Sequence, residues 1–191
     1  MTVTNDNNHS PHVRAGRHRH TRPRTLNLLD VENLVGGQVS SASVRDMWTE
    51  FVDIADPRWE DHSTVAVSRR NAAAAFFALP TGVRRVIGAD QPDGADLALI
   101  DSVDIHWVTT HFGRVMIGSG DHIFTNLAEQ LRDRGVDTIQ VIGGGSCSTE
   151  LYRACTAHAY LRRTREAAAA RQRSTRTEQR TADSATHALA G

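Results

Sequence analysis

The chain has 191 residues, a formal net charge of zero and no lysine, so all 22 of its basic residues are arginine. This length suffices for one domain with a hydrophobic core, while the missing lysine excludes Schiff-base chemistry and a Walker-type phosphate loop. Two cysteines without zinc-ligand spacing, no apolar run of membrane length and no hydrophobic signal region lead us to expect a cytoplasmic protein.

Hydrophobic spacing predicts strands and helices that alternate five times along the chain. Compact apolar runs bounded by turn residues predict strands at 26–31, 64–68, 83–88, 114–119 and 138–142. Apolar residues recurring every three or four positions predict helices at 40–56, 71–79, 95–110, 121–134 and 149–163. This alternation predicts an α/β fold, a three-layer α/β/α sandwich around a central, mainly parallel five-stranded sheet.

Arginine-rich segments flank the predicted domain, which spans residues 25–163. The N-terminal arm, residues 1–24, has five arginines, one acid and almost nothing apolar, so we expect it to be disordered. The tail, residues 164–191, is rich in arginine and alanine, and we expect it to be partly helical or disordered. Basic arms beside an acidic core are typical of polyanion binding, although solvated tails without a partner are the alternative. The arginines nearest the domain are the candidate contacts: Arg22, Arg24, Arg162, Arg163 and Arg165.

Three aspartates stand where predicted strands end or a helix begins. Asp30 follows one apolar run, Asp121 follows another, and Asp96 opens a helix just past a third strand. Because the carboxyl ends of parallel strands share one edge, the three carboxylates can converge there. Converging carboxylates repel one another unless a cation neutralises them, and Mg²⁺ prefers oxygen ligands. The pattern predicts a Mg²⁺ or Mn²⁺ site, although each aspartate taken alone could be a helix cap.

Four other polar residues are candidates for supporting roles: Asn33, Ser119, Asp101 and His122. The Asn33 amide follows Asp30 closely and could hold a water or a phosphate oxygen. The Ser119 hydroxyl could orient Asp121, and His122 beside it is either a general acid or a surface histidine. Asp101 lies on a different face of its helix from Asp96, so we expect a supporting or structural role.

The order and spacing of several motifs carry a resemblance to a known family. They are D-V-E-N-L at 30–34, G-A-D-L-A-L-I-D at 94–101, G-S-G-D-H-I-F-T-N-L at 118–127, L-R-D-R-G-V at 131–136, Q-V-I-G at 140–143 and S-C-S-T-E-L at 146–151. With these motifs the chain resembles the NYN domains, a branch of the PIN-like nucleases. The resemblance implies a PIN-like sandwich, metal-dependent RNA cleavage and a catalytic group formed by Asp30, Asp96, Asp121 and Asn33.

Two positions depart from the family pattern. Many members have a second acid two residues after the one that matches Asp121, and here that position is Ile123. Members often have a basic residue before the glycine of the G-x-D motif, and here that residue is Asp93. An acid at this position would repel RNA phosphates unless the basic arms compensate for it.

We therefore expect a Mg²⁺- or Mn²⁺-dependent ribonuclease whose partner is RNA, with no membrane association. Asp30, Asp96 and Asp121 would hold the metal, and the oligomeric state stays open. Two other functions remain as alternatives. One is an RNA- or protein-binding module that keeps the fold while Ile123 weakens catalysis. The other is a Mg²⁺-dependent phosphohydrolase acting on small molecules.

Overall fold

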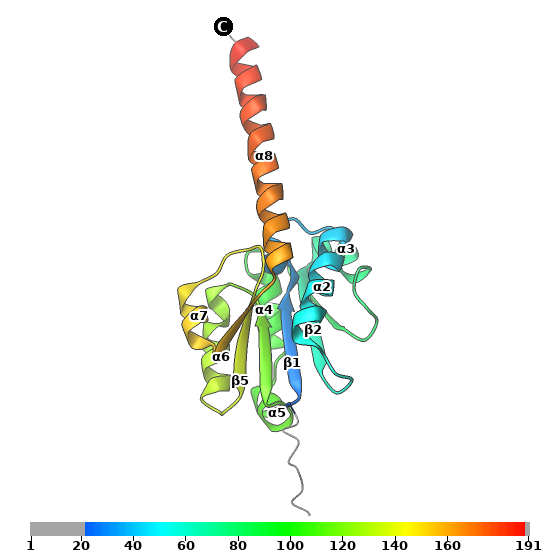
Figure 1. Ribbon diagram of the computed structural model, residues 1–191, viewed down its shortest axis with the longest axis vertical. Coiled ribbons are helices and arrows are strands. Elements are labelled where there is room, and N and C mark those ends of the chain that lie inside the picture. Colours follow the sequence, from blue (N-terminus) through cyan, green and yellow to red (C-terminus); the bar gives the residue numbers. More distant parts are fainter. Residues whose placement is uncertain (1–21, 190–191) are drawn as a thin grey trace, which may run out of the picture.

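The computed structural model describes the backbone of residues 22–189 and the side chains of residues 22–180. Most of the predicted N-terminal arm, residues 1–21, therefore lies outside the described residues. Within the described part, six parallel strands form one sheet in the order β3-β2-β1-β4-β5-β6 (Figure 1). The strands are β1 Thr25–Asp30, β2 His62–Ser68, β3 Arg84–Gly88, β4 Arg114–Gly118, β5 Asp137–Ile142 and β6 Ala157–Tyr160.

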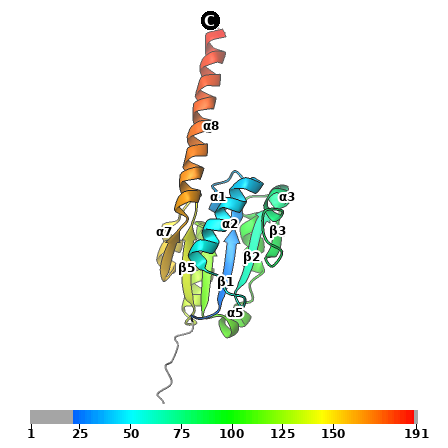
Figure 2. The same ribbon diagram turned by 45° about the vertical axis from the view of Figure 1, so that its right-hand side comes forward.

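Helices cover both faces of this sheet and make a three-layer α/β/α arrangement (Figure 2). One layer contains α1 Val31–Val35, α2 Ser41–Ala55, α3 Ala72–Phe76 and the first turns of α8 Arg162–Leu189. The other contains α4 Gly94–Asp101, α5 Ile105–His111, α6 Thr125–Arg132 and α7 Thr149–Ala154. Two short 3₁₀ helices, η1 Arg69–Asn71 and η2 His122–Phe124, follow β2 and precede α6.

The central strand β1 shows why the layers assemble in this way. All its residues are buried, with Leu26 and Leu28 packed toward α4 and α5 and Leu29 toward α1 and α2. A strand covered on both faces requires a nearly continuous apolar run, which is what residues 26–29 provide apart from Asn27. Among residues 22–189, no helix combines the length and the hydrophobicity needed to span a lipid bilayer.

The sheet has six strands, so the prediction of five is wrong. The segment 149–163, expected to be one helix, divides into α7, the short strand β6 and the start of α8. β6 is an edge strand whose Ala157 to Tyr160 pair with β5 alone, with Tyr160 in register with Ile142. Its alanines favour a helix locally, and only pairing with β5 makes the extended conformation stable. This tertiary contact is invisible to hydrophobic spacing.

The single helix predicted at 95–110 is also two helices, α4 and α5. The break falls at Asp104, whose carboxylate accepts a hydrogen bond from the Trp107 backbone N–H at 3.0 Å and caps α5. Asp is a strong N-cap residue, and here its capping competes successfully with continuation of the helix. The break turns α5 toward the N-terminal ends of the strands, away from the edge where Asp96 lies.

The long helix α8 begins at the sheet and extends well beyond the body of the domain (Figures 1 and 2). Glu50 of α2 fastens its start, because the carboxylate accepts hydrogen bonds from the backbone N–H groups of Arg163 and Thr164 at 2.9 and 2.8 Å. A carboxylate at this position complements the unpaired N–H groups and the dipole of the helix. Ala168, one turn further on, is buried against the glycines Gly36 and Gly144.

Candidate metal centre

The carboxyl ends of the strands surround a polar cavity of about 360 Å³. Asp30 ends β1, Asp121 follows β4 and Asp96 lies in the first turn of α4, so the sheet brings these three aspartates to one place. Two more acids, Glu32 and Asp93, line the same cavity. Five carboxylates around one small cavity form an arrangement that needs positive charge to be stable.

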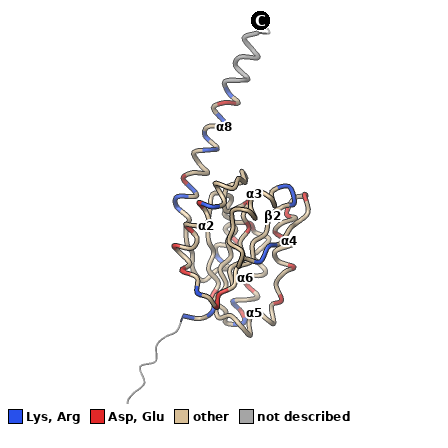
Figure 3. Tube along the Cα trace, turned by 90° about the vertical axis from the view of Figure 1, so that its right-hand side faces the viewer, with Lys and Arg blue, Asp and Glu red and all other residues tan. Residues whose placement is uncertain are grey.

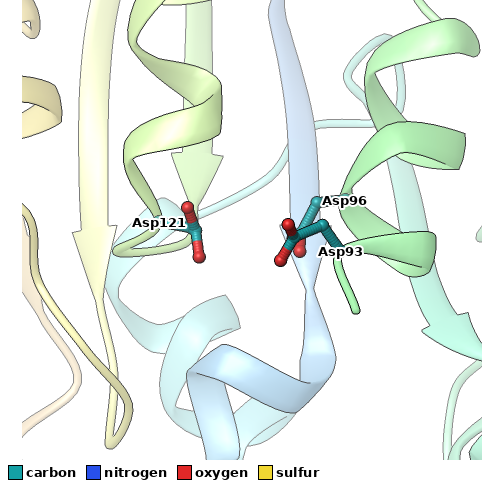
Figure 4. Close-up of side chains that lie close together, drawn as sticks. All are labelled: Asp93, Asp96 and Asp121. Atoms are coloured by element: carbon teal, nitrogen blue, oxygen red, sulfur yellow. The ribbon is translucent and has the colours of Figure 1, made fainter. Parts of the chain in front are cut away.

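Asp93, Asp96 and Asp121 form one group whose carboxylates could share a metal ion. Each offers a carboxylate oxygen, and these oxygens all lie within 4.8 Å of one another. Figure 4 shows Asp93 and Asp96 at the start of α4 on one side of the cavity and Asp121 on the other. Oxygens at this separation can be brought onto one hard divalent cation by small side-chain movements. Sequence reasoning did not select Asp93, because its position in a turn-rich loop carries no distinctive pattern.

Asp30 lies deeper, at the floor of the cavity, with only 4% of its surface exposed. Its carboxylate accepts hydrogen bonds from the Asn33 backbone N–H at 3.2 Å and from the Ser119 hydroxyl at 3.1 Å. Burial raises the pKa of Asp30 well above its ordinary value, and the neighbouring Asp96 carboxylate raises it further. These surroundings favour the protonated form of Asp30 more than those of an ordinary exposed aspartate do.

Asp96 is the acid of the cavity whose hydrogen-bonding capacity the described residues leave unsatisfied. Its Oδ1 atom is buried, and no donor among the described residues forms a hydrogen bond to it. Burial raises the pKa of Asp96, as do the charges of Asp121, Asp93 and Glu32, while a hydrogen bond with Asp30 lowers it. A buried carboxylate oxygen without a donor is costly, and a divalent cation would satisfy it. The donor set, which contains only oxygens, fits Mg²⁺ or Mn²⁺.

Glycines allow the loops that bear these acids to approach closely. A Cβ on Gly120 would lie 1.6 Å from the Ser146 backbone oxygen, and one on Gly94 would lie 2.3 Å from the Ala89 oxygen. Gly120 precedes Asp121 and Gly94 follows Asp93, so a larger residue at either glycine would push an acid away from the cavity. The motifs S-G-D and D-G-A-D therefore combine an acid with the small neighbour that its placement requires.

Asn33 and Ser119 tie the rim of the cavity together. The Asn33 side chain accepts a hydrogen bond from the Gly120 N–H at 2.9 Å and donates one to the Ser146 hydroxyl at 3.1 Å. The Ser119 hydroxyl donates to Asp30 and accepts from the Asp121 N–H at 3.1 Å. Both side chains therefore link the acids to the loops after β4 and β5. The second N–H of the Asn33 amide is the group that it could still offer to a phosphate oxygen.

The other predicted supporting residues lie at the edge of the site or away from it. The exposed His122 ring lies 3.0 Å from Asp121 Oδ1, which places a cation beside the cluster when the ring is protonated. Asp101 is exposed at the far end of α4 and does not line the cavity. Ile123 packs against the hydrophobic core, so an acid there would meet apolar side chains instead of the cavity. In this chain Asp93 is the additional acid that joins Asp96 and Asp121.

Sequence reasoning also missed Glu32 and Arg70, which line the cavity on the side of β2. Burial opposes ionisation of Glu32, but hydrogen bonds from Ser68 and Asn71 hold its pKa below the ordinary value. Glu32 thereby links α1 to the end of β2 as a stable carboxylate. The position of Glu32 within the D-V-E-N motif could have suggested that it belongs to the site. Nothing in the sequence, however, places Ser68 and Asn71 beside it.

The five arginines predicted to contact a polyanion lie in two different places. Arg22 and Arg24 precede β1, at the edge of the sheet opposite to the acidic cavity. Arg22 donates to Asp61 at 2.8 Å and Arg24 to the Glu60 backbone oxygen at 3.1 Å, so both side chains hold the fold together. The others, which lie in the first turns of α8 and thus at the same edge as the acids, are Arg162, Arg163 and Arg165.

A larger cavity, of about 620 Å³, lies at the N-terminal ends of the strands between the indoles of Trp59 and Trp107. Both of its acids have structural partners, since Asp61 pairs with Arg22 and Asp104 caps α5 by accepting a hydrogen bond from the Trp107 N–H. The chemistry therefore assigns the candidate site to the smaller cavity. No protein-family model matches the sequence, and no curated protein matches it either.

Proposed function

We propose that this protein is a divalent-metal-dependent ribonuclease, with a PIN-like fold of the NYN type. The observation that carries the proposal is the buried Asp96 oxygen, to which no described residue donates a hydrogen bond, together with the neighbouring carboxylates of Asp93 and Asp121. The all-parallel sheet and the three-layer arrangement are compatible with a PIN-like sandwich.

The residues of the cavity suggest a division of labour. Asp93, Asp96 and Asp121 would hold Mg²⁺ or Mn²⁺, and the buried Asp30 carboxyl is a further candidate ligand. The bound metal would supply an activated water and neutralise charge on the phosphodiester oxygens. Asn33 and Ser119 keep the acids in place through the hydrogen bonds described above, and Arg70 offers a positive charge at the rim.

Cleavage of a labelled single-stranded RNA in Mg²⁺ or Mn²⁺, with and without EDTA, tests the proposal. We expect EDTA to abolish cleavage and Asp121→Asn to reduce it by about 100-fold or more, because the change removes a charged ligand at nearly constant size. Asp101→Asn is the matched control: it removes an exposed acid from the far end of α4 and should leave cleavage unchanged.

The remaining outcomes distinguish the alternatives. Metal-dependent binding of RNA without cleavage would refute the ribonuclease and identify a binding module. Cleavage of small phosphodiesters but not of RNA would identify a small-molecule phosphohydrolase. If Asp121→Asn cleaves RNA as well as the unmodified protein does, the metal site is not at this cavity.

A further inference from the structure

One side of α8 carries a regular row of arginines. At 3.6 residues per turn, five of them fall within a sector of about 80° and extend along about 27 Å of the helix. They are exposed, and we call them the arginine stripe: Arg162, Arg165, Arg173, Arg176 and Arg180. Figure 3 shows basic positions recurring along α8 beyond the body of the domain. Between residues 162 and 180 the helix has seven arginines and two glutamates.

The stripe is separate from the side of α8 that packs on the domain. That packed side contains Thr164, Ala168 and Arg171, and Arg171 donates a hydrogen bond to the Val35 oxygen at 2.7 Å. Because α1, which ends at Val35, also carries Asn33 and follows Asp30 directly, α8 is anchored to the element that builds the cavity. The helix therefore holds its arginines in a defined position relative to the acids.

An aromatic cluster lies at the foot of the stripe. Tyr160 of β6 has the Arg165 guanidinium over its ring at 5.4 Å, and its hydroxyl lies 3.5 Å from that of Tyr152. Tyr152 in turn stacks on His158, with ring centres 3.6 Å apart. Both tyrosines are more than one-third exposed. We call these three residues, Tyr152, His158 and Tyr160, the aromatic cluster.

The aromatic cluster is connected both to the stripe and to the rim of the cavity. Tyr160 is in register with Ile142, the last residue of β5, and the loop after β5 carries Gly145 and Ser146 to the rim of the cavity. Tyr152 lies on α7, the helix that follows this loop. The loop after β5 therefore connects the rim of the cavity to the aromatic cluster, while α8 meets the same rim directly, since Ala168 packs against Gly36.

We propose that α8 and the aromatic cluster form the binding surface for single-stranded RNA and guide it into the acidic cavity. Arginines at helical spacing supply contacts to phosphates that do not depend on sequence, and they offset the repulsion that the acidic cavity exerts on RNA. Exposed tyrosine rings offer stacking to unpaired bases, which a duplex does not present. The choice of RNA over other polyanions rests on the proposed function, whereas the surface itself follows from α8 and β6.

Fluorescence anisotropy with a labelled oligouridylate of about 20 nucleotides tests the stripe, using the full chain in EDTA so that no cleavage occurs. Arg173→Gln/Arg176→Gln should weaken binding about tenfold and reduce the slope of log affinity against log salt by about 1.4. Arg45→Gln/Arg134→Gln removes the same charge from exposed positions elsewhere and should change neither quantity. Glutamine keeps the helical propensity, and circular dichroism checks that α8 is intact.

The aromatic cluster has its own test in the same assay. Tyr160→Ala should weaken binding about fivefold or more through loss of stacking, and Tyr160→Phe should retain the affinity because it keeps the ring. Phe77→Ala, which removes an exposed ring from a distant surface, should have no effect. Equal losses in Tyr160→Ala and Tyr160→Phe would overturn the stacking role.

Other outcomes would overturn the assignment of partner. One is an equal loss of RNA affinity in Arg173→Gln/Arg176→Gln and in the control Arg45→Gln/Arg134→Gln. The others are stronger binding to an RNA duplex than to a single strand, and stronger binding to anionic lipid vesicles than to RNA. Because binding is measured in EDTA, its result is independent of cleavage. A protein that binds through α8 but never cleaves would retain this inference and refute the ribonuclease. If Arg173→Gln/Arg176→Gln and Tyr160→Ala bind RNA as tightly as the unmodified protein and still cleave it, the ribonuclease would stand and this inference would be refuted.

Discussion

Two buried aspartates, one at each end of the central part of the sheet, have opposite surroundings. Asp61, before β2, accepts hydrogen bonds from the Arg22 guanidinium at 2.8 Å and from the Thr25 N–H at 2.7 Å. Asp30, at the end of β1, has two neutral donors, and its nearest charged neighbour is another carboxylate, Asp96. The fold neutralises the first acid and leaves the second uncompensated. Burial alone therefore does not separate the two kinds of acid, whereas the presence or absence of a counter-charge does, and it is the uncompensated acid that marks the candidate site.

Removing the ion pair between Asp61 and Arg22 should have the largest effect on stability. Asp61→Asn leaves the Arg22 guanidinium without its counter-charge, and we expect the free energy of unfolding to fall by about 3 kcal/mol. Chemical denaturation measures this change. Asp133→Asn, which disrupts the exposed pair with Arg132, should cost less than about 1 kcal/mol. Equal effects of the two substitutions would mean that Asp61 is not the structural acid described here.

Binding of a divalent cation at the acidic cavity should have the next largest effect on stability. Mn²⁺ at about 100 times its dissociation constant should raise the free energy of unfolding by about 2.7 kcal/mol, because only the folded state assembles the site. Denaturation with and without Mn²⁺ measures the gain, and calorimetric titration gives the dissociation constant. In Asp96→Asn most of the gain should disappear. If that variant is stabilised as much as the unmodified protein, the ion binds elsewhere.

A smaller effect concerns the pH dependence of the metal-free protein. Since the pKa of Asp30 is raised on folding, the native state binds more protons than the unfolded chain above the ordinary pKa of 3.8. Stability should therefore fall as pH rises from about 4 through the raised pKa. Asp30→Asn should flatten this dependence and stabilise the metal-free protein by about 1 kcal/mol at pH 7. Denaturation curves measured across pH test this. The same pH dependence of stability in Asp30→Asn and in the unmodified protein would contradict it.

Local sequence signals account for the elements that are stable through their own caps and faces. The helix predicted at 40–56 is observed at Ser41–Ala55, where Ser40 accepts a hydrogen bond from the Ser43 N–H and Asp56 ends the helix in a left-handed conformation. β6 was missed because its extended state depends on β5. The single helix predicted at 95–110 was wrong because capping by Asp104 outweighs a continuous apolar pattern.

The same distinction applies to the candidate site. The positions of Asp30, Asp96 and Asp121 at strand ends and a helix start were readable from the sequence, since parallel strands place such residues at one edge. The inclusion of Asp93 and Glu32 was not, because it depends on how the loop before α4 folds back and on Ser68 and Asn71 of another element. Likewise, the sequence shows where Ile123 stands but not that it packs into the core.

By itself, the sequence determined the alternation of strands and helices, the parallel sheet, the absence of lysine chemistry and the three acids that mark the edge. These depend on periodicity and on residue type, which are local properties. Only the tertiary structure decided that Asp61 is paired with Arg22 while Asp30 has no charged partner of opposite sign among the described residues, and that α8 extends beyond the body of the domain. Those outcomes depend on contacts between residues far apart in the chain, and the energy of a buried charge is set by such neighbours.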